Sequence, residues 1–148
     1  MIRYLLDTNV LLHLVNKAQG HELIAEQLKA RNPKQLFISV ITVWEISRMV
    51  EKKSSASPKA ALAALRLMGQ FQVMPLDAQS AAVGGNLHAH LANRGTTIGE
   101  RDSMIAGTAT VHEMDVVTDN IKEFYRVPGI LVHNWRTGQI RRIYVTDE

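Results

Sequence analysis

Short apolar segments alternate with helix-like segments along most of this chain, and this alternation limits the possible folds more than any other feature. The apolar segments are typical of buried strands and lie at residues 2–6, 36–38, 73–75, 116–117 and 130–132. Strands separated by helices pair in parallel, so the pattern predicts an α/β fold with helices on both faces of one mostly parallel sheet. Ligands of such sheets bind outside the carboxyl ends of the strands.

Helices are expected between these strands, because apolar residues recur at helical spacing and helix-start residues precede several of them. Pro58 is expected to begin one helix, Asp77 to be the N-cap of another, and Thr42 to open a third. The expected helices cover about residues 8–15, 21–30, 42–50, 58–71, 78–93 and 100–109.

The chain has the length and composition of one globular domain. Of its 148 residues, 46% are hydrophobic and 21% are charged, which is ordinary for a protein with a buried core. No repeat, low-complexity tract or linker divides it. We therefore expect one domain over residues 1–148, with a basic C-terminal tail over about residues 133–148.

Composition also excludes several kinds of site. The chain has no cysteine, so any catalytic metal must be bound by oxygen or nitrogen. No apolar run is long enough to span a membrane, and the N-terminus lacks the pattern of a secretory signal, so a cytoplasmic protein without membrane contact is expected. A net charge of +3 suits a nucleic-acid partner but is too small to identify one.

Five polar residues are expected near the carboxyl edge of the sheet. Asp7, Asp119 and Asn120 follow apolar strands, whereas Glu45 and Asp102 are expected in the first turn of a helix. Strand ends and helix starts meet at one edge of a doubly wound sheet. Carboxylates gathered there repel one another unless a cation lies between them, and oxygen ligands favour Mg²⁺ or Mn²⁺. Such a site suits the hydrolysis of a phosphodiester.

Each of these residues also has a purely structural explanation. Asp7 can cap the first helix, and Glu45 can complete a Thr42-x-x-Glu45 capping box. Asp102 is favoured near a helix N-terminus by the helix dipole, and an Asp-Asn pair such as 119–120 is common in turns. Singly, the five positions do not indicate a function.

Together, four blocks resemble the PIN-domain family, in particular the VapC and FitB toxins of bacterial toxin–antitoxin operons. The blocks follow in family order and span nearly the whole chain: LLDTN at 5–9, SVITVWEI at 39–46, IGERDSMIA at 98–106, and VTDN at 117–120 leading to Phe124. The resemblance implies a three-layer α/β/α sandwich with a central, mostly parallel twisted sheet.

The resemblance also implies a function and a set of site residues. Asp7, Glu45 and Asp102 match the three acidic metal ligands of the family, and the fourth position is either Asp119 or Asn120. Hydroxyl groups that support these ligands are expected from Thr8 and Thr118. The implied activity is that of a magnesium-dependent endoribonuclease toxin, with Mn²⁺ as the alternative ion, in which metal-activated water hydrolyses an RNA phosphodiester.

The same resemblance implies a homodimer, a cognate VapB-like antitoxin, and RNA, including tRNA, as the substrate. Basic residues near the blocks are candidates for RNA binding, although each one alone is more simply a solvated surface residue: Arg94, Arg101, Lys122 and Arg126. The tail adds Arg136, Arg141 and Arg142. Four apolar residues could line an antitoxin groove or a dimer face, but core packing is the commoner explanation: Trp44, Ile46, Met49 and Val50.

Functions of other classes fit parts of the sequence. A non-catalytic PIN-like module that only binds RNA or protein is motivated by Asn120, which is neutral where a carboxylate is common. Against it, a decayed site has no reason to keep three mutually repelling carboxylates. An aspartyl phosphatase would need a second aspartate two residues after Asp7, where the chain has Asn9, and no glycine-rich phosphate loop is present for a GTPase or ATPase.

Overall fold

The computed structural model describes residues 1–52 and 58–143. The helices are α1 (Thr8–Val15), α2 (His21–Lys29), α3 (Val40–Glu51), α4 (Pro58–Met68), α5 (Ala78–Asn93), α6 (Glu100–Val111) and α7 (Ile121–Phe124), with a 3₁₀ turn at Pro33–Gln35. The strands are β1 (Tyr4–Leu6), β2 (Leu36–Ser39), β3 (Gln72–Met74), β4 (Asp115–Val117), β5 (Leu131–His133) and β6 (Ile140–Arg142). None of the described helices is long and apolar enough to cross a membrane.

The strands form one sheet in the order β3-β2-β1-β4-β5-β6. The first five strands are parallel, as the sequence predicts, and β6 runs antiparallel to β5. The chain moves outward from β1 through β2 to β3, then returns to the other side of β1 with β4. This change of direction places a topological switch point at the carboxyl ends of β1 and β4, where ligands of open α/β sheets bind.

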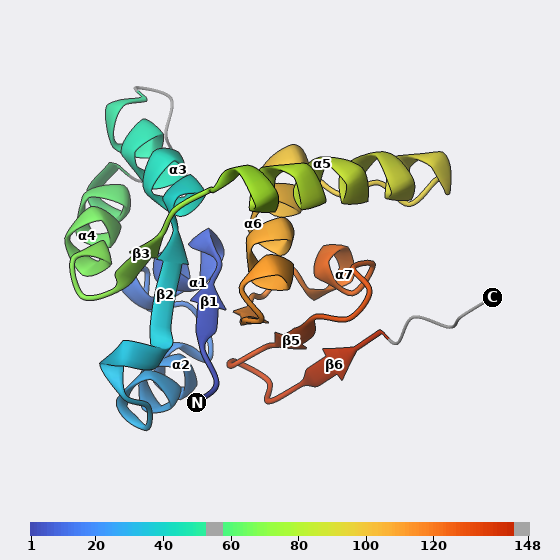
Figure 1. Ribbon diagram of the computed structural model, residues 1–148. Coiled ribbons are helices and arrows are strands. Elements are labelled where there is room, and N and C mark those ends of the chain that lie inside the picture. The colour runs from blue at the N-terminus through green and yellow to red at the C-terminus, as the bar shows by residue number, and fades with distance from the viewer. Residues whose placement is uncertain (53–57, 144–148) are drawn as a thin grey trace.

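Helices cover both faces of the sheet, so the expected three-layer sandwich is confirmed (Figure 1). Successive residues of a strand point to opposite faces. Leu5 accordingly packs into a core with residues of α5, α6 and α7, whereas Leu6 packs into a second core with residues of α1 to α4. Val116 and Val117 of β4 divide between the two cores in the same way.

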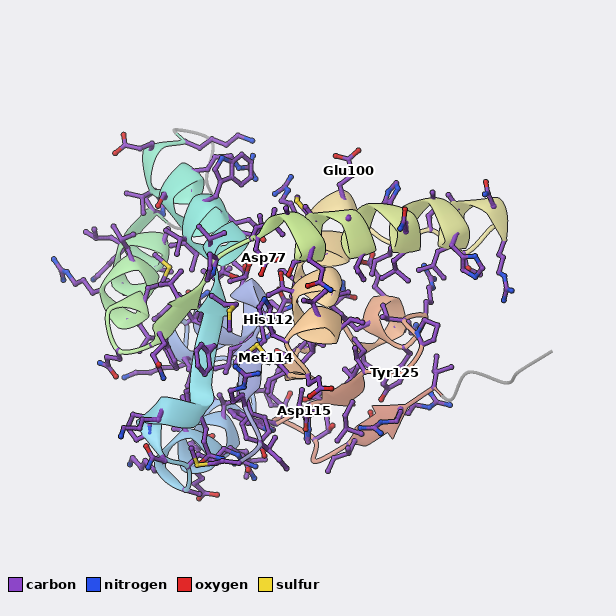
Figure 2. The ribbon with its side chains drawn as sticks, in the orientation of Figure 1. Asp77, Glu100, His112, Met114, Asp115 and Tyr125 are labelled. Carbon is purple, nitrogen blue, oxygen red and sulfur yellow. The ribbon has the colours of Figure 1, made fainter. Side chains whose placement is uncertain are left out.

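The start of α5 is hydrogen-bonded to the end of α6 through two side chains. Asp77 is the N-cap of α5, as predicted, and its Oδ1 accepts a hydrogen bond from the amide of Ser80 at 2.7 Å. Its Oδ2 lies 2.7 Å from Nε2 of His112, the C-cap residue of α6, and the two side chains are labelled in Figure 2. These hydrogen bonds hold the pKa of Asp77 below its ordinary value.

The predicted start of α3 is wrong. The helix begins at Val40, and its N-cap is Ser39, whose Oγ accepts a hydrogen bond from the amide of Ile41 at 3.0 Å. Thr42 is therefore a buried helical residue, and Glu45 lies in the second turn of the helix. Since Ser39 already caps the helix, the expected Thr42–Glu45 capping box does not form.

The sequence predicts a basic tail from about residue 133, but His133 ends β5, residues 134–139 form a turn, and β6 follows at Ile140–Arg142. Trp135 is 6% exposed and belongs to the core that contains Leu6, and β6 follows it. The sequence did not indicate β6, because all three of its side chains are exposed and it joins the sheet through its backbone. Residues 144–148 of the expected tail lie outside the described residues.

Candidate active site

Asp7 lies at the switch point, directly after β1. It is 5% exposed and caps α1, with Oδ1 accepting a hydrogen bond from the amide of Thr8 at 2.7 Å. Its Oδ2 accepts one from Oγ1 of Thr118 at 2.9 Å and one from Nδ2 of Asn9 at 3.2 Å. Residues after β1 and β4 therefore fix this carboxylate from both sides.

Glu45 reaches the same edge from α3. Its Oε1 accepts a hydrogen bond from Oγ1 of Thr8 at 3.1 Å, and Oγ1 of Thr8 also lies 3.1 Å from Oγ1 of Thr42. Its Oε2 lies 3.4 Å from Nη1 of Arg101, at the start of α6. Thr8 thus joins the backbone next to Asp7 to the carboxylate of Glu45.

Asp102 lies in the first turn of α6 and faces Glu123 of α7. The two carboxyl groups share a hydrogen bond. Glu123 also accepts hydrogen bonds from the side chain of Asn120 and the backbone of Gly99. A Cβ at Gly99 would lie 3.5 Å from Oδ2 of Asp102 and 4.0 Å from Oε2 of Glu123, so a methyl group at this position would touch the carboxyl pair.

Two carboxyl groups at this edge carry raised pKa values. Burial raises the pKa of Asp7 to about 6, against hydrogen bonds from Thr118 and Thr8 that lower it, and the charges of Glu45 and Asp119 raise it further. Burial also raises the pKa of Asp102 to about 8, together with the hydrogen bond to Glu123 and the charges of Asp7 and Glu45. The acidic side chains are therefore close enough to repel one another.

Glu123 is a member of the site that sequence reasoning missed. Its pKa is lowered, first by the hydrogen bond with Asp102 and then by hydrogen bonds from Asn120 and Gly99. The sequence does contain one indication, since Glu123 lies three residues after Asn120 on a short helix, and residues at that spacing share a face.

The two candidates for the fourth site residue have different surroundings. Asp119 turns toward His13 of α1, with which its Oδ2 is paired, and toward Nη1 of Arg136 at 3.6 Å. Its backbone amide also donates to Oδ1 of Asn9 at 3.3 Å. Asn120 donates from its backbone to Oγ1 of Thr118 at 2.9 Å, and its side chain donates to Glu123.

His13 and Arg136 were also missed as neighbours of the site. The six histidines have no recognisable metal-ligand spacing in the sequence, so nothing there singles out His13. In the structure its Nδ1 lies 3.4 Å from Nη1 of Arg136, which also reaches Asp119. The contact spans 123 positions of the chain, so only the fold brings the two residues together.

The predicted basic residues are distributed unevenly around the acidic edge. Arg101 contacts Glu45, and the charge of Arg126 lowers the pKa of Glu123. Lys122 is exposed on α7. Arg94 is the C-cap of α5, whose end extends away from the sheet (Figure 1). In the tail, Arg141 lies over the ring of Tyr125, and Arg142 lines a pocket at the amino end of β4.

An open pocket of about 350 Å³ lies over this part of the molecule. It is lined by Glu45, Gly99, Glu100, Arg101 and Asp102, and the side chain of Glu100 points away from the body of the molecule (Figure 2). Among the described residues, no three acidic or histidine side chains stand close enough to hold a metal ion as they are oriented here. Instead, Asp7 is held by Thr118, Glu45 by Arg101 and Asp102 by Glu123.

Comparison with known proteins identifies the family. The model of the PIN domain matches residues 4–130. The chain is 35% identical to the tRNA(fMet)-specific endonuclease VapC of Salmonella typhimurium, over 91% of this chain and 99% of the relative. It is 30% identical to Ribonuclease VapC2 of Haemophilus influenzae, again over 91% and 99%. The crystal structure of DNA-bound VapBC from Salmonella typhimurium matches with a TM-score of 0.76 and 34% identity, over 91% of this chain and 99% of that chain. The chain therefore belongs to the PIN-domain family and, within it, to the VapC proteins of toxin–antitoxin systems.

Proposed function

We propose that the chain is a metal-dependent endoribonuclease that acts as the toxin of a VapBC-type pair. One observation carries the proposal: Asp7, Glu45, Asp102 and Glu123 come from four different parts of the chain and lie along the same edge of the sheet, where the charges of the other three raise the pKa of Asp102. Carboxylates gathered in this way cost stability unless a cation balances them. The printed names of the relatives, endonuclease and ribonuclease, agree with this chemistry.

The donor set fits a hard divalent cation. Asp7, Glu45, Asp102 and Glu123 offer only oxygen atoms, which suits Mg²⁺, with Mn²⁺ as the alternative. In the present arrangement Arg101 contacts Glu45 and Glu123 contacts Asp102, and a bound cation would take the place of these contacts. When bound, the cation supplies positive charge opposite the phosphate and makes a water molecule more acidic.

The surrounding residues orient the acidic side chains. Thr118 and the amide of Thr8 fix the rotamer of Asp7, and the hydroxyl of Thr8 holds Glu45 toward it. These contacts fit the supporting roles expected of both threonines. Arg101 balances one oxygen of Glu45 and contributes positive charge where the RNA backbone must approach an acidic pocket.

We place Glu123 at the fourth acidic position in preference to Asp119 or Asn120. Glu123 shares a hydrogen bond with Asp102, whereas Asp119 is paired with His13 and Arg136. Asn120 acts through Glu123, to which it donates a hydrogen bond. A neutral residue at position 120 therefore does not remove a carboxylate from the site, and this weakens the case for a non-catalytic module.

The partners follow from the family and stay proposals for this chain. The matched Salmonella structure is a VapBC complex, and we infer a VapB-like antitoxin here, together with a homodimer. The relative named for tRNA(fMet) makes tRNA the first substrate class to examine. We expect the protein to act in the cytoplasm, where tRNA is found.

The test is cleavage of a total tRNA pool by antitoxin-free protein, with and without Mg²⁺. Asp7→Asn and Asp102→Asn variants, checked for folding by circular dichroism, are the matched controls. Cleavage should require both Mg²⁺ and the wild-type carboxylates. If the folded wild-type protein binds RNA but cuts none with Mg²⁺ or Mn²⁺, the non-catalytic module becomes the correct hypothesis.

A further inference from the structure

Trp44 on α3 is an exposed aromatic residue that the proposed mechanism leaves unexplained. Core packing was the commoner explanation for the apolar residues of α3, and it holds for Ile46, which is 0% exposed. It is wrong for Trp44, which is 53% exposed. Tryptophan is enriched at interaction surfaces, because its ring is apolar and its N–H can still meet water or a partner.

Two arginines flank the ring of Trp44. Cζ of Arg101 lies 5.1 Å from the ring centroid, and Cζ of Arg48 lies 5.3 Å from it. Arg48 is one helical turn after Trp44 on α3, whereas Arg101 comes from the start of α6. Cation–π contacts at these distances keep the guanidinium groups beside the indole and leave their charge in solvent.

This cluster is continuous with the acidic edge. Arg101 touches both Trp44 and Glu45, since its Nη1 lies 3.4 Å from Oε2 of Glu45. Arg101 and Glu45 also line the open pocket that contains Asp102. The indole therefore lies beside the place where the proposed function requires a phosphodiester to bind.

We propose that Trp44, with Arg48 and Arg101, is a stacking platform for a nucleotide of single-stranded RNA next to the bond that is cut. Aromatic side chains beside positive charge bind single strands, because every base has a face that stacks and every nucleotide carries a phosphate. The charge of Arg48 favours RNA, because no carboxylate in the described part of the chain forms an ion pair with it. This inference rests on the proposed function and adds a contact that selects unpaired nucleotides.

Binding can be measured through the indole itself. The chain has two tryptophans, and the other one, Trp135, is only 6% exposed. We would titrate the full-length, antitoxin-free protein with a single-stranded RNA oligonucleotide in EDTA at low salt and follow tryptophan fluorescence. The matched ligand is an abasic oligonucleotide of the same length, which has the same phosphates but no bases.

RNA should quench the fluorescence of the wild-type protein, and the abasic oligonucleotide should quench it much less. Trp44→Ala should weaken RNA binding, followed by fluorescence anisotropy of labelled RNA, by about tenfold, while Trp44→Phe keeps most of the affinity. Arg48→Ala should reduce the slope of log affinity against log salt by about one. Leu62→Ala on α4, where Leu62 is 40% exposed, is the control and should change neither quantity.

The binding assay needs no cleavage, so its result is separate from that of the tRNA assay. Equal binding of RNA by wild type and Trp44→Ala would overturn the platform even if the wild-type protein cuts RNA. If Trp44→Ala keeps its RNA affinity but no longer forms the dimer, or no longer retains a co-expressed antitoxin, Trp44 belongs to a protein interface instead.

Discussion

Glu123 and Asp119 are four residues apart in the chain, yet their side chains have different partners. Glu123 faces Asp102, and Asp119 faces His13 and Arg136. Glu123→Gln should therefore reduce RNA cleavage by more than about 100-fold, whereas Asp119→Asn should cost about 10- to 100-fold at most, the range of residues that only position a ligand. Single-turnover rates at saturating Mg²⁺ measure both. A larger loss in Asp119→Asn would make Asp119 the fourth acidic residue.

Asp102 allows a test of charge repulsion without substrate. In the metal-free folded chain it keeps its proton up to pH about 8, whereas the reference value is 3.8. A raised pKa means that the free energy of unfolding falls as the pH rises between these values. The lowered pKa of Glu123 offsets part of this effect. At pH 8 without metal, Asp102→Asn should melt a few degrees above wild type, and the difference should shrink toward pH 4.

Differential scanning calorimetry at several pH values measures the difference in melting temperature between Asp102→Asn and the wild type. Glu113→Gln, which replaces an exposed carboxylate at the other end of α6, is the control and should leave the melting temperature unchanged. If Asp102→Asn melts below wild type at every pH, then the shared hydrogen bond with Glu123 outweighs the repulsion among the carboxylates.

The sequence predicts a site residue where a local pattern marks it. It does not predict a site residue that only tertiary contacts bring to the site. Asp7 follows a strand, Asp102 lies in the first turn of a helix, and Glu45 belongs to a recognisable block, so their placement at one edge of the sheet could be predicted. The contact of Glu123 with Asp102 depends on how α7 packs against α6. The pairing of His13 with Asp119 depends on α1 lying beside the end of β4, which no periodicity in the sequence encodes.

At the scale of elements, α5 and α6 pack unusually closely, and this packing positions Asp102. A Cβ at Gly107 would lie 2.4 Å from the backbone oxygen of Ser80, and one at Gly84 would lie 2.7 Å from that of Ser103. Gly107→Ala should therefore destabilise the protein by about 1–3 kcal/mol, because backbone atoms must move to admit the methyl group. Chemical denaturation with urea measures the change.

Gly85 on α5, next to the closely packed Gly84, gives a control. A Cβ there meets nothing within 4 Å, so Gly85→Ala should be neutral or stabilise α5 by up to about 1 kcal/mol, since alanine favours helices. Equal effects of the two substitutions would mean that helix propensity, and not the close contact of α5 with α6, decides the stability here.

The sequence predicts some of the helices and strands better than others. Periodic apolar residues and caps such as Asp77 predicted most helices and the five parallel strands. The start of α3 was placed too late, because Ser39 and Thr42 are both good N-caps and only the extended conformation of Ser39 decides between them. Strand β6 has three exposed residues and pairs through its backbone, so no apolar pattern marks it.

For the molecule as a whole, the proposed activity requires that Asp7, Glu45, Asp102 and Glu123 together bind a divalent cation. The sheet topology places all four at one edge, and the remaining surface supplies the arginines and Trp44 that an RNA strand would need. Binding of a cation by the folded chain alone must stabilise the fold, because the unfolded chain lacks the site.

The measurement that tests this claim most directly is the melting temperature as a function of Mg²⁺ concentration, for wild type, Asp7→Asn and Glu113→Gln. At a concentration about tenfold above Kd, one such site adds about 1.4 kcal/mol, or roughly 4 °C, to the wild type and to Glu113→Gln. Asp7→Asn should gain little. If Mg²⁺ and Mn²⁺ leave the wild-type melting temperature unchanged, or raise that of Asp7→Asn equally, the four carboxylates do not form the proposed site.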